Sequence, residues 1–286
     1  MPETRTIAVT GASGFLGGAL ADLYRARGNP VIALKRSNGG TYDLRRSVEP
    51  RLFASVDTIF HAAYISADDA ADAFDANVRG AQNLLAAARS AGVRRVVFLS
   101  SCSASPTGRS TYARQKHAIE ELMRDAGHSI VRPGLVLGSG GLFQRMTAHL
   151  SRRRHVPLVS GGRQPVHTVH VDDFARACDA ASSAAPATYY IAEPRPVRYA
   201  DLMRAIAAHI CRPISLVPMP GLLLRLAASA ANHAGVRMPV SHDSIIGLSD
   251  LRVVDSQPSL EALGCDARSY LESLASLPRA PLDGAG

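Results

Sequence analysis

Short apolar runs alternate with longer segments of helical spacing along the first 138 residues. The apolar runs lie at residues 6–10, 31–34, 56–60, 93–99 and 128–131. Such runs are typical of strands buried on both faces of a parallel sheet. Between them, apolar residues recur at steps of three and four, which is typical of one helix face. The alternation predicts βαβ units, and therefore an α/β fold with a Rossmann-like, doubly wound parallel sheet.

Glycines mark where three of the predicted helices end. We expect these helices at residues 16–27, 74–88 and 112–125. Gly28, Gly92 and Gly127 follow them. Glycine readily adopts the left-handed conformation that closes a helix, so each helix is expected to end there.

The alternating pattern weakens after Gly138. Eight prolines interrupt residues 157–220. We expect residues 1–138 to form the Rossmann domain and residues 139–277 a smaller, mixed substrate lobe that can exchange segments with the first half. Residues 278–286 are expected to form a flexible tail.

A glycine-rich turn joins the first predicted strand to the first predicted helix. It begins at Thr10 and carries glycines at 11, 14 and 17. Gly11 allows a sharp turn, Gly14 leaves room for a pyrophosphate, and Gly17 lets the helix pack closely on the strand. A diphosphate would bind the free N–H groups at the helix start. The turn predicts a dinucleotide site whose contacts are Gly11, Ser13, Gly14, Phe15, Leu16 and Gly17.

The residues after the second predicted strand favour NADP over NAD. NAD-binding proteins commonly place a carboxylate there, against the ribose 2′-hydroxyl. This strand is followed by Lys35, Arg36 and Ser37, with no carboxylate. A guanidinium can bind a 2′-phosphate through two hydrogen bonds, so Arg36 is the expected contact. Asp43 and Leu44 are expected near the adenine ring, although Asp43 is equally compatible with a turn.

Tyr112 and Lys116 are one helical turn apart. This spacing places the phenol and the ammonium on one helix face. The ammonium favours the phenolate and lowers the phenol pKa toward the range useful for acid–base catalysis. It can also reach a ribose hydroxyl of a bound cofactor. The chain has two lysines and eight tyrosines, so the pair seldom arises by chance.

Five segments of the first half occur together in one order. They are TGASGFLG at 10–17, HAA at 61–63, NVRGAQNLL at 77–85, VVFLSS at 96–101 and YARQK at 112–116. This set resembles the extended short-chain dehydrogenase/reductases of the NAD(P)-dependent epimerase/dehydratase type. Segments at 132–141, 161–177 and 251–264 also resemble that family, so the likeness covers nearly the whole chain.

The resemblance implies a Ser–Tyr–Lys catalytic set. Tyr112 would be the general acid or base, and Lys116 would lower its pKa and hold the nicotinamide ribose. Ser101 would polarise the substrate oxygen, with Ser100 and Ser103 as open alternatives.

The same resemblance implies further residues around the cofactor. Ala62 and Ala63 would lie near its ribose and diphosphate, and Pro133 near the nicotinamide. Asn77 matches a family asparagine whose role is either structural or catalytic. Family members often dimerise through two helices of the Rossmann half, which here implies a homodimer through residues 74–88 and 112–123.

Two features differ from members that act on sugar nucleotides. Ser101 and Tyr112 are only 11 positions apart, where those members usually carry a much longer loop. Pro133 is followed by Gly134, where many epimerases carry an asparagine. We therefore expect an NAD(P)-dependent oxidoreductase that moves a hydride between nicotinamide and the carbonyl or alcohol carbon of a small molecule. The alternatives are a nucleotide-sugar epimerase, dehydratase or 4-keto reductase, and a non-catalytic NAD(P)-binding subunit or redox sensor.

Composition narrows the expected partners. The net charge is +8, but the arginines are scattered and aromatic residues make up only 5%, so no nucleic-acid partner is expected. The most apolar segment, residues 221–231, contains Arg225 and is too short to cross a membrane. Without a secretory signal pattern, we expect a reducing, cytoplasmic setting.

No metal site is expected. The four cysteines form neither a CxxC nor a zinc spacing. His167, His170, Asp172 and Asp173 fit a strand that leads into a helix, with the two aspartates capping the helix start. Cys102, next to the expected serine, is interpreted as a small buried residue and not as a nucleophile.

Overall fold

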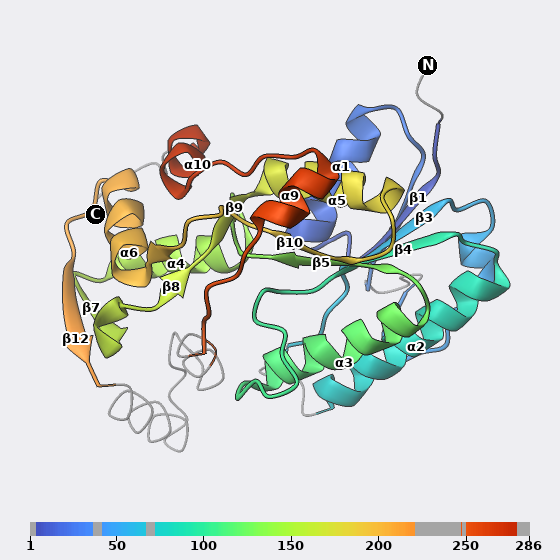
Figure 1. Cartoon of the computed structure of the whole chain (residues 1–286), viewed down its shortest axis with the longest axis horizontal. Helices are drawn as coiled ribbons and strands as arrows, with labels where there is room; N and C mark the ends of the chain where they lie inside the picture. The colour runs from blue at the N-terminus through green and yellow to red at the C-terminus, as the bar shows by residue number, and fades with distance from the viewer. Residues whose placement is uncertain (1–3, 37–41, 67–71, 221–246, 248–249, 279–286) are drawn as a thin grey trace.

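Six parallel strands form the central sheet of the computed structural model, which describes residues 4–36, 42–66, 72–220, 247 and 250–278 (Figure 1). Their order across the sheet is β10-β5-β4-β3-β1-β2. The bounds are β1 Ile7–Thr10, β2 Val31–Leu34, β3 Thr58–His61, β4 Arg95–Leu99, β5 Ser129–Pro133 and β10 Thr188–Ile191. The predicted doubly wound fold is confirmed, and each apolar run of the first half supplies a strand.

Helices cover both faces of this sheet (Figure 1). On one face α2 (Ala73–Ser90) packs beside α3 (Thr111–Asp125), and on the other α1 (Phe15–Ala26) packs beside α5 (Val171–Ser183). The glycines expected to end three of them, Gly28, Gly92 and Gly127, all have positive φ. The homodimer through α2 and α3 stays a prediction.

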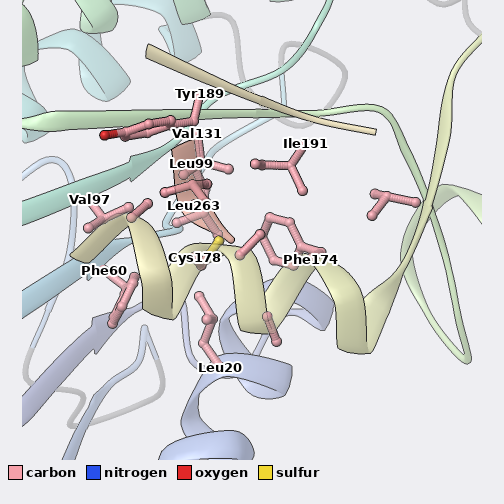
Figure 2. Packing of buried hydrophobic residues seen from close by; sticks show 14 of the residues in the cluster. Leu20, Phe60, Val97, Leu99, Val131, Phe174, Cys178, Tyr189, Ile191 and Leu263 are labelled. Carbon is pink, nitrogen blue, oxygen red and sulfur yellow. The ribbon is translucent and has the colours of Figure 1, made fainter. Parts of the chain in front are cut away.

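Apolar side chains from both halves of the chain fill the layer between the sheet and α5 (Figure 2). Phe60 of β3 and Val97 of β4 meet Phe174 and Cys178 of α5, while Leu20 reaches the same cluster from α1. All five are at most 1% exposed. Dense packing of this kind makes α5 a part of the Rossmann core, although it follows Gly138 in sequence.

A strand from beyond Gly138 completes the sheet. β10 pairs in parallel with β5, Thr188 opposite Ile130 and Ile191 opposite Pro133. The domain boundary expected at residue 138 stays a prediction. Both β10 and α5 lie beyond it in sequence and pack with the first half.

Within the described residues, the remaining elements are three two-stranded sheets and four helices beside the main sheet (Figure 1). The sheets pair β6 (Leu135–Leu137) with β9 (Thr168–His170), β7 (His155–Val159) with β12 (Ser215–Met219), and β8 (Pro165–Val166) with β11 (Val197–Arg198). The helices are α4 (Gly141–Arg152), α6 (Tyr199–His209), α9 (Gln257–Leu263) and α10 (Tyr270–Ser276). Short 3-10 turns lie at Pro50–Phe53 and Ser160–Gly162.

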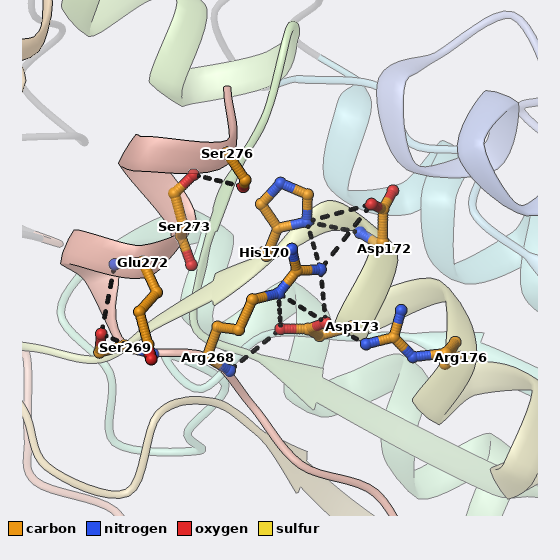
Figure 3. Close-up of polar contacts among 9 residues, drawn as sticks. All are labelled: His170, Asp172, Asp173, Arg176, Arg268, Ser269, Glu272, Ser273 and Ser276. Carbon is orange, nitrogen blue, oxygen red and sulfur yellow. Dashed lines mark hydrogen bonds and ion pairs between the residues drawn. The ribbon is translucent and has the colours of Figure 1, made fainter. Parts of the chain in front are cut away.

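An ion-pair cluster joins the segment before α10 to the start of α5 (Figure 3). Arg268 donates to the Asp173 carboxylate through Nε and through Nη2, the latter at 2.7 Å, and Arg176 binds the same carboxylate. The expected capping by Asp172 and Asp173 is wrong: the His170 ring accepts the Asp172 N–H at 3.2 Å and caps α5. Asp173 is 1% exposed and is held by its arginines instead.

No helix within the described residues is both long and apolar enough to cross a membrane. The apolar segment 221–231 and the predicted tail beyond residue 278 lie outside the described residues.

Candidate active site

The glycine turn lies where the order of the strands reverses, between β1 and β3. Gly11 has φ +67°, and a Cβ there would lie 2.8 Å from the Ala63 nitrogen. A Cβ on Gly17 would lie 2.4 Å from the Gly11 oxygen. Both glycines are therefore required for β1, α1 and the end of β3 to approach one another. In open α/β sheets, ligands bind at this position, outside the carboxyl ends of the strands.

The start of α1 has the features of an anion site. Gly14 is its first flanking residue, and within the described chain no side chain caps the helix and no acidic residue stands in its first turn. Ser13 and Gly14 are exposed. The free N–H groups and the positive end of the helix fit a dinucleotide diphosphate.

Only the backbone of Phe15 and Leu16 is placed to contact the predicted dinucleotide. Both side chains pack on the apolar core. The Phe15 ring also lies under a second glycine tract, where a Cβ on Gly138 or Gly140 would come within 2.6 or 2.4 Å of it. The ring thus links the predicted dinucleotide turn to the beginning of the second half.

A buried hydrogen bond joins the ends of β1 and β3. Thr10 Oγ1 and His61 Nδ1 are 2.9 Å apart, and the Ala63 N–H donates to the same threonine oxygen at 3.2 Å. Within the described chain, His61 Nε2 has no partner. Burial, aided by the nearby charge of Lys116, lowers the pKa of His61 to about 3. His61 is therefore neutral near pH 7, and Thr10, which it contacts, accepts the N–H groups of Ala62 and Ala63.

Lys116 lies in the interior at the end of β4. Its side chain donates to the Leu99 carbonyl at 2.7 Å, and the residue is 5% exposed. Its ammonium lies within 6 Å of the ring centroids of Tyr64, Phe98 and Tyr112. Burial lowers the pKa of Lys116 to about 8, so the ammonium is mostly protonated at neutral pH.

Tyr112 stands in the first turn of α3, which Ser110 caps by accepting the Ala113 N–H. Burial raises the pKa of the Tyr112 phenol, and a hydrogen bond with the Ser101 side chain opposes that rise. The structure thus brings together Ser101, Tyr112 and Lys116, the three residues expected to act in catalysis.

The other two candidate serines have different surroundings. The Ser100 hydroxyl donates to Glu120, and the Ser103 N–H donates to Ser101 Oγ at 3.1 Å. Ser101 is the one that hydrogen-bonds to the Tyr112 phenol.

A buried ion pair lies behind the three candidate catalytic residues. Glu120 is 0% exposed and accepts hydrogen bonds from Ser100 and from two nitrogens of Arg132. Arg132 also donates to the Tyr190 hydroxyl at 2.6 Å. Ser100 and Arg132 directly precede Ser101 and Pro133, so this network supports two strand ends at the site. Sequence reasoning missed Glu120, although its position four residues after Lys116 places it on the same helix face.

Only some of the side chains predicted to bind the adenosine end of the cofactor are free to reach a ligand. Lys35 and Arg36 are exposed after β2, whose Leu34 carbonyl accepts the Gly11 N–H at 3.0 Å. Asp43 accepts the Arg45 N–H at 2.9 Å, which matches the turn alternative. Leu44 is 5% exposed and packs against Gly80 of α2, so its side chain points into the core, and its place near the adenine ring stays a prediction. Ser37 lies outside the described residues.

Asn77 has the bonding pattern of a structural residue. Its amide donates to the carbonyls of Ile65 and Ala73, each at 2.8 Å, and its oxygen accepts the Ile65 N–H at 2.9 Å. It therefore holds the segment that follows Ala63. Pro133 is buried at the end of β5, and its carbonyl accepts the Cys102 N–H at 3.1 Å.

Cys102 is half-buried beside Ser101. Burial raises the pKa of the Cys102 thiol to about 12, which disfavours the nucleophilic thiolate.

His167, which was considered as a metal ligand, has protein partners at both ring nitrogens. Val254 N–H donates to His167 Nε2 at 3.1 Å, which leaves His167 Nδ1 to donate to the Glu193 carbonyl at 2.8 Å. Among the described residues, no three His, Cys, Asp or Glu side chains form a group that could hold a metal ion.

Comparison with known proteins places this site in a family. Residues 7–192 match the model of the NAD dependent epimerase/dehydratase family. The 4-hydroxy-2-methyl-3-oxo-4-farnesyl-3,4-dihydroquinoline-1-oxide ketoreductase of Stigmatella aurantiaca is 28% identical over 79% of this chain and 78% of that protein. The 2-alkyl-3-oxoalkanoate reductase of Stenotrophomonas maltophilia is 29% identical over 72% of this chain and 76% of its own. The structure of MoeE5 in complex with UDP-glucose and NAD has the same fold, with a TM-score of 0.72 and 22% identity, covering 95% of this chain and 96% of that one.

Proposed function

Because the chain belongs to the NAD-dependent epimerase/dehydratase family, we propose that it is a ketoreductase that prefers NADPH and acts on a ketone bearing a long hydrocarbon group. The observation that carries this proposal is the grouping of Ser101, Tyr112 and Lys116 beside the glycine turn. The strand ends of a doubly wound sheet are where such a substrate would bind.

The residues fit the dinucleotide that the proposal requires. The uncapped start of α1 and the glycines at 11, 14 and 17 suit its diphosphate. Lys116 would hold the nicotinamide ribose, and Ala62, Ala63 and Pro133 would line the bound cofactor. Arg36 would bind a 2′-phosphate, since it is exposed at the end of β2 and Leu34-Lys35-Arg36 contains no carboxylate.

The proposed mechanism assigns one task to each side chain. The reduced nicotinamide, when bound, supplies the hydride that reaches the carbonyl carbon. The Ser101 hydroxyl donates a hydrogen bond to the carbonyl oxygen and stabilises the negative charge that develops there. Tyr112 gives its phenolic proton to that oxygen and is left as a phenolate.

Lys116 makes this proton transfer feasible in a buried site. Burial raises the pKa of the Tyr112 phenol and thus opposes phenolate formation. A protonated lysine one helical turn away offsets that cost. The alcohol product then leaves, and Tyr112 takes up a proton from solvent.

The substrate class rests on the two relatives. Their names describe reductases of a farnesyl-substituted dihydroquinoline oxide and of 2-alkyl-3-oxoalkanoates. Both are reductases of oxo compounds that carry hydrocarbon chains. The short connection from Ser101 to Tyr112 also differs from the long loop typical of sugar-nucleotide members.

The test is the oxidation of NADPH by purified protein with a 2-alkyl-3-oxoalkanoate. We expect turnover, and we expect Tyr112→Phe to lower kcat by about 10²- to 10⁴-fold while NADPH binding, followed by nicotinamide fluorescence, changes less than about twofold. Tyr199→Phe, on α6 in the second half, is the matched control and should retain turnover.

Three outcomes would contradict the proposal. Turnover of UDP- or dTDP-sugars in place of ketones would indicate the nucleotide-sugar alternative. NADPH binding without turnover of either class would indicate the non-catalytic subunit. Full activity of Tyr112→Phe would remove the assigned proton donor.

A further inference from the structure

One aromatic ring contacts both members of the proposed acid–base pair. The Tyr64 ring centroid lies 5.4 Å from that of Tyr112, with the two rings nearly perpendicular at 84°. Lys116 Nζ lies 5.0 Å from the Tyr64 centroid. Edge-to-face ring pairs and cations beside a ring are both favourable arrangements. Tyr64 therefore touches the phenol-bearing ring and the ammonium at once.

Among the residues that the structure describes, three rings surround the Lys116 ammonium. Besides Tyr64, Phe98 lies 4.8 Å and Tyr112 5.9 Å from it. Phe98 is 1% exposed and belongs to the core, whereas Tyr64 is only half-buried. A ring is attractive to a cation through its negative faces, and this attraction strengthens where water is excluded. The three rings thus stabilise a charge that burial disfavours.

The backbone next to Tyr64 is held in place from α2. The Asn77 side chain makes two hydrogen bonds to Ile65, one to its N–H and one to its carbonyl, and a third to Ala73. On the other side, Ala63 N–H donates to Thr10. Both chain neighbours of Tyr64 are therefore fixed, which limits the positions its ring can take. This gives Asn77 a structural task close to the site.

We propose that Tyr64 is a positioning residue, whose aromatic ring holds the Tyr112 ring and the Lys116 ammonium in their working arrangement. The inference rests on the proposed acid–base role of that pair. Loss of the ring should leave the ammonium less stabilised, so Lys116 should release its proton at lower pH. A less charged Lys116 would in turn support the Tyr112 phenolate less well.

The chain itself provides a clean probe of this effect, because Lys116 and Lys35 are its only lysines. Protein labelled with ¹³C at the lysine Cε should show two titrating signals, and Lys35→Arg identifies the signal of Lys116. In Tyr64→Leu we expect the Lys116 pKa to fall by about 0.5 to 1 pH unit. The signal of Lys35, which is exposed after β2, should not move and serves as the internal control.

The conservative variant separates the ring from the hydroxyl. Tyr64→Phe keeps the ring and should keep the Lys116 pKa within about 0.2 units of the wild type. In the ketone assay, Tyr64→Leu should lower kcat by about tenfold with KM changed less than about twofold, and Tyr64→Phe should restore most of kcat.

Two results would overturn the proposal. One is an unchanged Lys116 pKa in Tyr64→Leu, and the other is a shift of that pKa in Tyr64→Phe as large as in Tyr64→Leu. Should Tyr64→Leu not fold, Tyr64→Met supplies a flexible apolar side chain of similar length for the same titration. The titration needs no substrate, so it tests the role of Tyr64 even if the chain reduces no ketone. Whether the chain reduces a ketone is tested separately, by the NADPH-oxidation assay with the wild type and Tyr112→Phe.

Discussion

Lys116 shows how a buried cation is kept charged close to neutral pH. Burial disfavours the ammonium and lowers its pKa to about 8, and the nearby Glu120 carboxylate acts in the opposite direction. The hydrogen bond to the Leu99 carbonyl and the surrounding rings stabilise the same charge. The lysine therefore remains able to support a phenolate, although Arg132 already neutralises Glu120.

Arg36 should decide between the two dinucleotides. Replacing it with Gln removes the guanidinium that would bind the 2′-phosphate but leaves the glycine turn intact. We expect the Kd for NADPH to rise by about 10- to 100-fold and the Kd for NADH to change little, because NADH has no phosphate at that position. Fluorescence titration of each nucleotide measures both values. Arg51→Gln, at an exposed arginine of the 3-10 turn before β3, is the control. Equal losses for both nucleotides would place the phosphate elsewhere.

His61 should make stability depend on pH below about 6.5. Its pKa is lowered from an ordinary value of 6.5 to about 3 in the folded chain. Between these values the unfolded chain binds a proton that the folded chain does not, so the free energy of unfolding falls as the pH falls. The limit for one such group is about 1.4 kcal/mol per pH unit.

Urea unfolding at several pH values between 4 and 7 checks this. In His61→Gln the decrease in stability toward acid should be smaller than in the wild type by up to that amount per unit. His155→Gln, at an exposed histidine of β7, provides the matched control. An unchanged slope in His61→Gln would mean that His61 is protonated in the folded chain.

The site residues that could be predicted from the sequence are those whose role follows from their spacing along one helix or one turn. Tyr112 and Lys116 share a helix face, and Gly11, Gly14 and Gly17 share one turn. Tyr64 could not be found this way, because it follows β3, whereas Tyr112 and Lys116 lie on α3. The expected cap of α5 failed for a related reason: Asp173 has a stronger partner in Arg268, which is 95 positions away.

At the scale of elements, the docking of α1 depends on one of two neighbouring glycines. A Cβ on Gly17 would lie 2.4 Å from the Gly11 oxygen, which is backbone and cannot yield, whereas a Cβ on Gly18 would lie 3.6 Å from the Ala12 oxygen. Gly17→Ala should therefore push α1 off the strand, destabilise the fold by about 2 kcal/mol or more, and abolish dinucleotide binding.

Gly18→Ala is the matched control on the same helix. It should be neutral or stabilise by up to about 1 kcal/mol, because alanine loses less backbone freedom than glycine on folding. Thermal unfolding and NADPH titration of both variants measure the difference. Equal behaviour of the two variants would mean that the close contact at Gly17 can be relieved without cost.

Local pattern predicted five of the six sheet strands, since each of the five is a short apolar run. The sixth, β10, reads Thr-Tyr-Tyr-Ile and alternates between half-buried and buried positions. Nothing in those four residues indicates which strand they pair with. The partner is set by how α5 spans the sheet before β10 begins, which is a property of the tertiary structure.

At the scale of the whole molecule, the first half cannot bury its own sheet. α5 covers the face that carries Val97, Leu99 and Val131, and β10 pairs with the edge of β5. A fragment of residues 1–138 would expose this face and an unpaired strand edge, both of which favour aggregation. We expect it to show no cooperative thermal transition by circular dichroism.

A fragment of residues 1–220 regains α5 and β10 and is the matched comparison. It should recover a thermal transition that the shorter fragment lacks. A cooperative transition in residues 1–138 alone would show that the sheet is stable without its sixth strand.

The return of the chain to the sheet through α5 and β10 also limits how new specificities can be built on this scaffold. A substrate lobe transplanted from a relative as one cassette after residue 138 would bring a foreign α5 and β10 into the host's core. The exchangeable parts are instead residues 139–170 and the chain after residue 191, provided that α9 and Arg268, which pack on or bind the host's α5, are also kept from the host. Recombination among members of this family should therefore succeed at crossover points on either side of residues 171–191 and fail within them.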